Sequence, residues 1–134
     1  MKKVIGFAAL VCVLCVAMTG CTSFFSSGLV KGFSGSEYGT KMNAHFSYFN
    51  GDRGAYIPLK QGDTISITYN LTCTAGTMTL TFEDKDGNLL FTNADAIGTG
   101  EVTADATQTY TLRLTGVGAQ GSYAISWEVK KAGS

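Results

Sequence analysis

The sequence is short of charge, of histidine and of proline. Charged residues make up 15% of its 134 residues, and ten Lys and Arg side chains balance ten Asp and Glu side chains. A protein that binds nucleic acid needs a basic surface to neutralise phosphates, and this chain has no excess of basic residues. The composition therefore argues against a nucleic-acid partner, and the length indicates one small domain.

Catalytic and zinc-binding side chains are equally scarce. His45 is the only histidine, it falls in a predicted strand beside Asn43 and Ser47, and the chain has no Gly-x-Ser-x-Gly motif. A hydrolase needs a nucleophile and a base held together, and zinc needs three or four ligands. We therefore expect a protein that is not an enzyme, and a hydrolase that uses His45 is the least favoured alternative.

The first twenty residues have the layout of a secretory signal peptide. Lys2 and Lys3 precede an apolar run over residues 4–18, shorter than the roughly 20 residues that cross a bilayer. The sequence VAMTGC at residues 16–21 resembles a bacterial lipobox, in which the cysteine is lipidated and becomes the mature N-terminus. We therefore expect residues 1–20 to be cleaved and Cys21 to anchor the protein to the extracytoplasmic face of a bacterial cell membrane.

Cleavage would also determine which of the other cysteines remain in the mature protein. Cys12 and Cys15 would leave with the signal peptide, and Cys21 would carry lipid, so that Cys73 would remain alone. No internal disulfide could then form, and stability must come from the core. Cys73 shares the parity of Leu71 in a predicted strand, which predicts that its thiol is buried, with a reactive or intermolecular thiol as the alternative.

Residues 21–40 are rich in Ser and Gly, a composition typical of a flexible spacer. Phe24, Phe25 and Phe33 do not suit a pure linker, and two alternatives remain open for this segment: contact with the lipid interface, or an irregular edge strand. The domain proper is expected over residues 41–134.

Alternation of apolar and polar residues dominates the remaining sequence and predicts half-buried strands. The clearest segments are residues 64–71, 77–82, 109–115 and 123–130, and weaker ones are 42–49, 55–60, 88–92 and 100–103. Turn sequences rich in Gly, Asn and Asp separate them. The pattern predicts an all-β fold, a single antiparallel β-sandwich of jelly-roll type with about seven or eight strands, and a small β-barrel as the alternative.

Two further features of the strand segments can be interpreted. Pro58 cannot donate a hydrogen bond to a neighbouring strand, which predicts an edge position or a bulge. Tyr110, Tyr123 and Trp127 fall on the apolar faces of their strands, which predicts that they belong to the core.

Three strings carry a resemblance to known proteins: FSYFNG at residues 46–51, IPLKQGDTI at residues 57–65 and GSYAISWE at residues 121–128. Together they resemble small lipoproteins of Firmicutes, and the order of strands and turn glycines is similar to that of bacterial pre-peptidase C-terminal-type β-sandwich domains. The resemblance covers residues 46–130 and implies a jelly-roll-like accessory or binding module.

One turn has the residues of a possible calcium site. Asp84, Asp86 and Asn88 present oxygen atoms at alternate positions, which suits a hard cation, and Asp95 could add another ligand. The glycine of this loop is out of place for a calcium loop, and Asp-Gly between two strands is a strong hairpin signal. We favour the turn and keep a calcium-stabilised structural envelope protein as an alternative function.

Phe49 and Tyr56 are the aromatic residues predicted to be exposed, and they are candidate ligand contacts because aromatic rings are common platforms for sugars and peptides. The sequence as a whole predicts a lipid-anchored, non-enzymatic binding module of the cell envelope. Its expected partners are the membrane, through the lipid, and either an envelope polysaccharide or a protein.

Overall fold

The computed structural model describes residues 23–132, and every regular element in this part of the chain is a strand. Seven strands follow one another in antiparallel pairings: β1 (Ser23–Lys31), β2 (Ser34–Tyr38), β3 (Lys41–Leu59), β4 (Thr64–Glu83), β5 (Leu89–Thr92), β6 (Ile97–Thr103) and β7 (Gln108–Lys130). No helix that could span a membrane occurs within residues 23–132.

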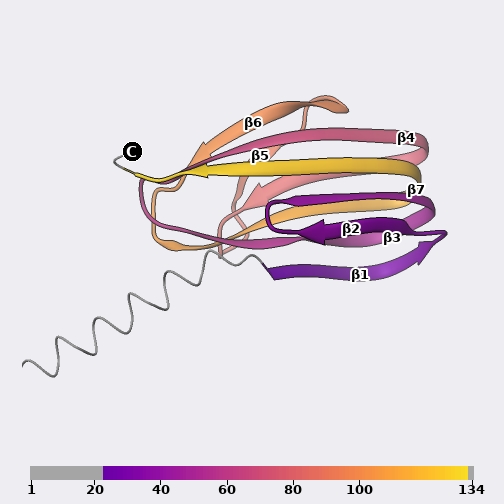
Figure 1. Cartoon of the computed structure of the whole chain (residues 1–134), viewed down its shortest axis with the longest axis horizontal. Helices are drawn as coiled ribbons and strands as arrows, with labels where there is room; N and C mark the ends of the chain where they lie inside the picture. Colours follow the sequence, from indigo (N-terminus) through magenta and orange to yellow (C-terminus); the bar gives the residue numbers. More distant parts are fainter. Residues whose placement is uncertain (1–22, 133–134) are drawn as a thin grey trace, which may run out of the picture.

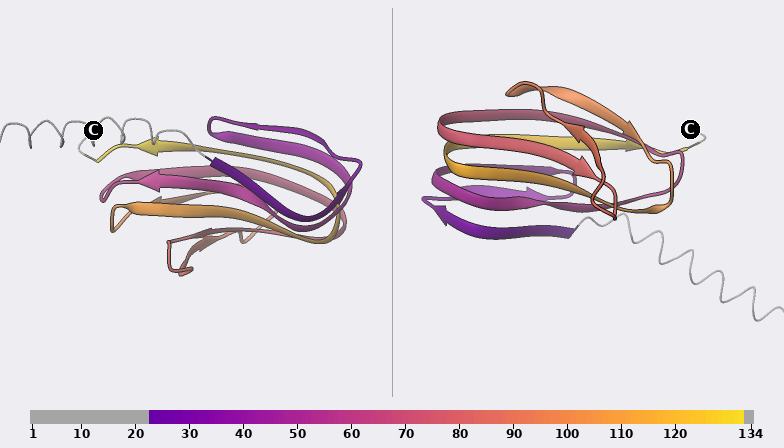
Figure 2. Two further views of the ribbon diagram at one scale, coloured as in Figure 1. Left: turned by 90° about the horizontal axis from the view of Figure 1, so that it is seen from below. Right: turned by 180° about the vertical axis from the view of Figure 1, so that it is seen from behind.

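Three of the strands are long enough to serve two layers. Figures 1 and 2 show β3, β4 and β7 turning over at one end of the molecule, so that each contributes two arms. Layer A contains, in spatial order, β2, residues 41–46 of β3, residues 121–130 of β7, residues 64–73 of β4, and β6. Layer B contains β1, residues 51–59 of β3, residues 108–116 of β7, residues 77–83 of β4, and β5.

The core lies between the two layers and is built from alternate residues of the long strands. All four clear alternating segments are confirmed, because their apolar positions are buried, Val129 only partly, and their polar positions point outward. Tyr110, Tyr123 and Trp127 belong to this core, as predicted. The predicted β-sandwich is therefore confirmed, and the strands do not close into a barrel.

The positions at which the long strands turn over coincide with the predicted turn sequences. In β4 the register shifts on either side of Ala75, and Gly76 has a φ of +72°, where a Cβ would overlap the carbonyl oxygen of Gly118. The side chain of Asn50 in β3 accepts a hydrogen bond from the backbone amide of Gly118 in β7, at 2.9 Å. The bends of β3 and β7 are thus tied to each other, and small residues allow the backbones to approach.

The prediction of a flexible spacer over residues 21–40 is wrong for those of its residues that the structure describes. β1 and β2 pair with β3 from Ser23 to Tyr38, and they form one edge of layer B and one edge of layer A. Phe24 explains part of this order, because its ring packs against the core beside Trp127, with 6.3 Å between the ring centroids. The edge-strand alternative is observed, and contact of this segment with lipid stays a prediction.

Pro58 has the edge position that its chemistry requires. It lies opposite Thr109 of β7 on one side, whereas the described part of β1 starts opposite Tyr56 and does not reach it. Its missing amide proton therefore removes no hydrogen bond with the described part of β1.

Candidate functional site

The outward face of layer A carries a trough that follows the middle strand, β7. Register places three rows of side chains across β3, β7 and β4, and each row has a small residue at its centre. The rows are Lys41–Ser126–Thr68, Asn43–Ala124–Asn70 and His45–Ser122–Thr72. We call these nine residues the trough.

Strand geometry explains why these residues form a depression. The two flanking strands lie about 10 Å apart, twice the spacing between neighbouring strands, and their longer side chains rise on both sides of Ser122, Ala124 and Ser126. Residues of one strand face repeat about every 7 Å along it, so that the three rows extend over about 14 Å. The result is an elongated site rather than a closed pocket.

Three adjoining hollows lie along this face and are open to solvent. One of 160 Å³ is lined by His45 and Ser122, among others. The next, of 410 Å³, reaches from Asn43 and Ala124 to Ile97 on β6, and the third, of 270 Å³, continues to Glu128. The depression therefore runs from the bends toward the opposite end of layer A. Figure 1 shows the strand arms that carry it.

Polar groups on one wall of the trough are available to a ligand. Within residues 23–132, the side chains of Lys41, Asn43 and His45 form no hydrogen bond and no ion pair. On the outward face of layer B, by contrast, Arg113 lies 3.5 Å from Asp52 and 3.7 Å from Glu83, and Thr115 donates a hydrogen bond to Asp52. The trough thus offers donors and acceptors that its own neighbours do not satisfy.

Two exposed apolar side chains stand on the rims. Tyr38 at the end of β2 lies opposite Lys41 and is 63% exposed, and Ile97 of β6 lies opposite Asn70 and is 67% exposed. Sequence reasoning missed Tyr38 because the Ser- and Gly-rich segment around it gave no alternation of apolar residues. A tyrosine ring beside a row of hydrogen-bonding groups could stack on a sugar or a peptide.

Phe49, a predicted ligand contact, is fully buried, so that prediction is wrong. The register of β3 against β7 shifts on both sides of Phe49, and these irregularities turn Phe46 and Phe49 to the same side. Their rings meet edge to face, with 5.4 Å between the centroids. The prediction for Cys73 is also wrong, because Cys73 lies at the bend of β4 and is exposed rather than buried.

Tyr56, the other predicted contact, is exposed as expected, at 43%. It lies on the outward face of layer B, far in the fold from the trough, and its ring packs against Phe25 with a centroid distance of 4.8 Å. Phe49 and Tyr56 therefore do not form one site, and a ligand role of Tyr56 stays a prediction.

The turn with Asp84, Asp86 and Asn88 uses its carboxylate within the loop. Asp84 accepts hydrogen bonds of 2.9 Å from the backbone amides of Asp86 and Asn88 and from the side chain of Asn88. The hydrogen bond from the Asn88 side chain, together with those from the backbone, lowers the pKa of Asp84 below its ordinary value. These contacts confirm the turn, and calcium binding by Asp84, Asp86, Asn88 and Asp95 stays a prediction.

The described part of the chain holds no group of three or more His, Cys, Asp or Glu side chains arranged to hold a metal ion. His45 lies in the trough wall, and no carboxylate within residues 23–132 pairs with it. Cys21, the predicted lipidation site, lies outside the described residues.

Comparisons with known proteins give remote structural likenesses only. No family model and no curated protein matches the sequence. Among solved structures, a family 11 carbohydrate-binding module from Clostridium thermocellum aligns with a TM-score of 0.46 at 10% identity, over 83% of this chain and 89% of that one. The xylan-binding domain CBM22-1 of Xyn10C from Paenibacillus barcinonensis gives a TM-score of 0.42 at 14% identity, over 82% and 87%.

A third likeness is to PliG from Aeromonas hydrophila, a periplasmic inhibitor of g-type lysozyme, with a TM-score of 0.41 at 11% identity, over 81% of this chain and 87% of that one. None of these likenesses assigns a ligand to this chain.

Proposed function

We propose that this protein is a non-enzymatic binding module of the bacterial cell envelope, anchored by lipid at Cys21, and that the trough of layer A holds an extended, polar and largely uncharged polymer. An envelope polysaccharide fits this description. The observation that carries the proposal is the set of three aligned rows in which small central residues lie between polar side chains, those on the β3 side making no hydrogen bond within the described residues.

The shape of the site argues for an extended ligand. Three hollows adjoin one another on a single sheet face, and none of them is enclosed. A small substrate is usually held in a concave pocket that buries most of its surface, which this face does not provide. A chain lying along β7 could contact all three rows at once, so that several weak contacts would add up.

The chemistry of the trough argues for a ligand with hydroxyl and amide groups. Lys41 of the trough and Glu128 next to its end line the same hollow, so that charges of both signs adjoin this part of the site. Asn43 and Asn70 provide donors and acceptors in the central row. A strongly charged ligand would find no complementary field here, whereas the hydroxyl groups of a neutral sugar chain can both donate and accept.

The test is co-sedimentation of the full-length protein, in detergent, with insoluble peptidoglycan sacculi and with a panel of insoluble neutral polysaccharides. Ala124→Tyr fills the centre of the trough and should abolish binding without lowering the melting temperature. Thr79→Tyr is the matched control, since Thr79 is an exposed outward residue of layer B, and it should bind as the wild type does. Binding that survives in Ala124→Tyr would contradict the proposed site. If the protein binds none of the polysaccharides but crosslinks to an envelope protein, the partner is that protein and not a polysaccharide.

A further inference from the structure

We propose that the outward face of layer B at the start of β1 rests on the lipid bilayer, with Phe25 and Tyr56 in the headgroup region, so that the trough on layer A faces away from the membrane. This inference rests on the lipid anchor at Cys21 that belongs to the proposed function. It concerns a surface that the trough does not use.

Chain length leaves almost no distance between the anchor and the folded body. β1 begins at Ser23, which pairs with Tyr56 of β3. Two residue steps separate Cys21 from Ser23, and an extended chain covers at most about 7 Å in two steps. Because no spacer intervenes, a diacylglyceryl group on Cys21 would hold this corner of the sandwich against the membrane surface.

The surface next to that corner is aromatic. Phe25 points outward from β1, and its ring packs on Tyr56, which is 43% exposed. Gly54, opposite Phe25, leaves the room for this ring, because a Cβ at Gly54 would lie 2.7 Å from it. Leu29, further along β1, is 52% exposed.

The rest of the same face is different in character. Its other outward positions on β4 and β7 are mainly threonines, among them Thr79 and Thr111. Leu89 on β5, opposite Glu83, is a further exposed apolar residue of this face, but it lies at the edge farthest from β1. The apolar residues next to the anchored end of the chain are therefore those of the β1 edge. Tyrosine is enriched at membrane interfaces because its ring is apolar and its hydroxyl is polar, and the pair Phe25–Tyr56 has this character.

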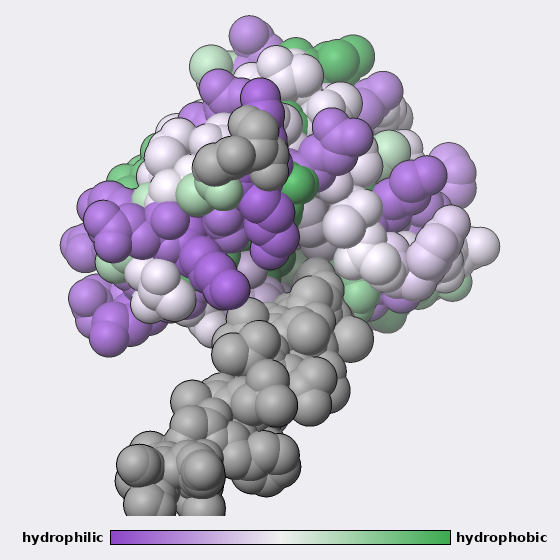
Figure 3. Space-filling model, turned by 60° about the vertical axis from the view of Figure 1, so that its left-hand side comes forward, coloured by the Kyte–Doolittle hydropathy of each residue, from purple (hydrophilic) through white to green (hydrophobic). Residues whose placement is uncertain are grey.

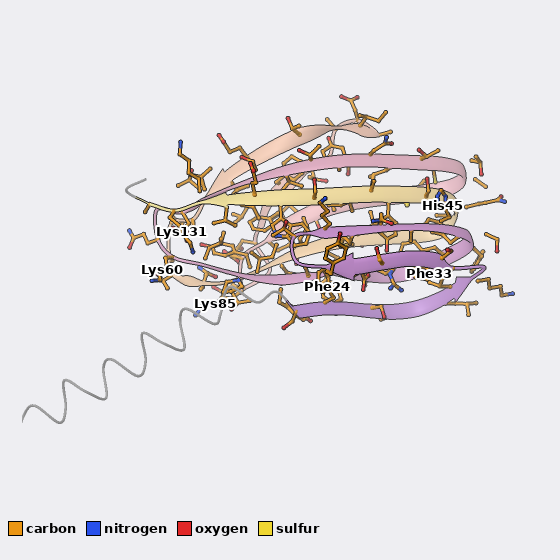
Figure 4. The ribbon with its side chains drawn as sticks, in the orientation of Figure 1. Phe24, Phe33, His45, Lys60, Lys85 and Lys131 are labelled. Carbon is orange, nitrogen blue, oxygen red and sulfur yellow. The ribbon has the colours of Figure 1, made fainter. Side chains whose placement is uncertain are left out.

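Electrostatic attraction is not needed for this contact. Figure 4 places Lys60, Lys85 and Lys131 at the end of the sandwich away from the bends, and Figure 3, which brings this end forward, shows a largely hydrophilic surface. Acidic residues of the same loops offset these lysines: Asp63, Asp84, Asp86 and Asp105. On the contact face itself, the guanidinium of Arg113 lies 5.3 Å from the centroid of the Phe25 ring and is paired with Asp52 and Glu83. The charges of this face are thus offset too, and the contact should depend little on the charge of the lipids.

The experiment uses the full-length protein, processed in its bacterial host, purified in detergent and reconstituted into phosphatidylcholine vesicles with and without brominated acyl chains. Bromine quenches tryptophan emission only at close range, so Tyr56→Trp reports contact with the bilayer. Tyr38→Trp is the matched control, because Tyr38 is an exposed tyrosine of layer A. The buried Trp127 emits in every variant, and the emission of the wild-type protein gives this common background.

We expect brominated lipid to remove the extra emission of Tyr56→Trp and to leave that of Tyr38→Trp unchanged, with the same result when phosphatidylglycerol is added to the vesicles. Equal quenching at both positions, or none at position 56, would overturn the orientation. A change in the emission of Tyr56→Trp when a soluble polysaccharide is added in the absence of vesicles would also overturn it.

Intact-mass measurement on the same samples separates this inference from the anchor on which it rests. A mass without the diacylglyceryl group at Cys21 would refute the anchor and the orientation together. A lipidated protein whose Tyr56→Trp is not quenched would refute the orientation alone. Binding by the trough is measured independently of both.

Discussion

Arg53 of layer B reaches across the sandwich to Glu37 of layer A, with 3.1 Å between its guanidinium and the carboxylate. Its Nε also donates a hydrogen bond to the hydroxyl of Tyr123, at 3.1 Å, and its guanidinium lies over the ring of Phe33. Burial raises the pKa of Tyr123 to about 12, against the opposing effect of Arg53, so that this phenol stays neutral near pH 7. The contacts fasten β2, the edge strand of layer A, to the opposite layer.

Replacing Arg53 with Met should destabilise the protein, because it leaves Glu37 without a partner at a site where both side chains are less than a fifth exposed. We expect a loss of about 2 to 3 kcal/mol, somewhat below the cost of breaking a fully buried ion pair. Urea unfolding of Arg53→Met, Glu37→Met and the double variant gives the coupling. If the two single effects simply add, the pair does not link the layers.

Sequence patterns were sufficient for the long strands of this fold. Isoleucine, leucine and aromatic residues alternate with polar residues over residues 64–71 and 109–115, and those positions are buried because each layer covers only one face of its partner. Glycine and asparagine marked the bends, since these residues permit the backbone conformations and close approaches found there.

The same patterns could not reveal the edge strands or the trough. β1 and β2 bury few side chains, so their sequence lacks the alternation that identifies a strand, and pairing with β3 supplies their order instead. The trough depends on which residue of β3 lies opposite which residue of β7. That register links Asn43 with Ala124, far apart in the chain, and local periodicity carries no information about it.

Asp63 should make the stability of the protein fall in acid. Its carboxylate accepts hydrogen bonds from the backbone amides of Lys60 at 2.9 Å and Ala132 at 3.0 Å, and it fastens the C-terminal end of β7 to the turn before β4. Burial alone would raise the pKa of Asp63, but these hydrogen bonds and the nearby Lys131 and Lys60 outweigh it and hold the pKa below 3.8.

Because the folded-state pKa of Asp63 lies below the unfolded-state value, its ionised form stabilises the fold at neutral pH, and this contribution is lost as the pH falls below about 4. Asp63→Asn should cost about 1.5 to 3 kcal/mol at pH 7, the usual worth of a hydrogen bond to a charged group. The difference from the wild type should shrink in acid, as thermal unfolding between pH 2.5 and pH 7 would show, using roughly the range that brackets the carboxyl pKa. A difference that is the same at every pH would rule out this role of the carboxylate.

Asp84→Ala should lower the melting temperature more than Asp86→Ala does. Asp84 holds the turn between β4 and β5 through three hydrogen bonds, whereas the side chain of Asp86 makes none within the described residues. Adding calcium should leave the melting temperature of the wild type unchanged, because the Asp84 oxygens are already used by the turn. A calcium-dependent rise that disappears in both variants would instead support the calcium site.

Gly116→Ala should destabilise the protein through Phe49. A methyl group at position 116 would overlap the ring of Phe49, which is fully buried beside the bend of β3. Overpacking of this kind costs about 1 to 3 kcal/mol, since the ring must leave its preferred rotamer or the strands must separate.

A second substitution tests whether that cost arises at this contact. Phe49→Ala removes the ring atoms that the new methyl group would strike, so Gly116→Ala should cost clearly less in the Phe49→Ala background than in the wild type. Denaturant unfolding of the two single variants and the double variant measures the difference. Additive effects would mean that position 116 requires glycine for its backbone conformation. The space left by the missing side chain of Gly116 would then not be what allows Phe49 to be buried.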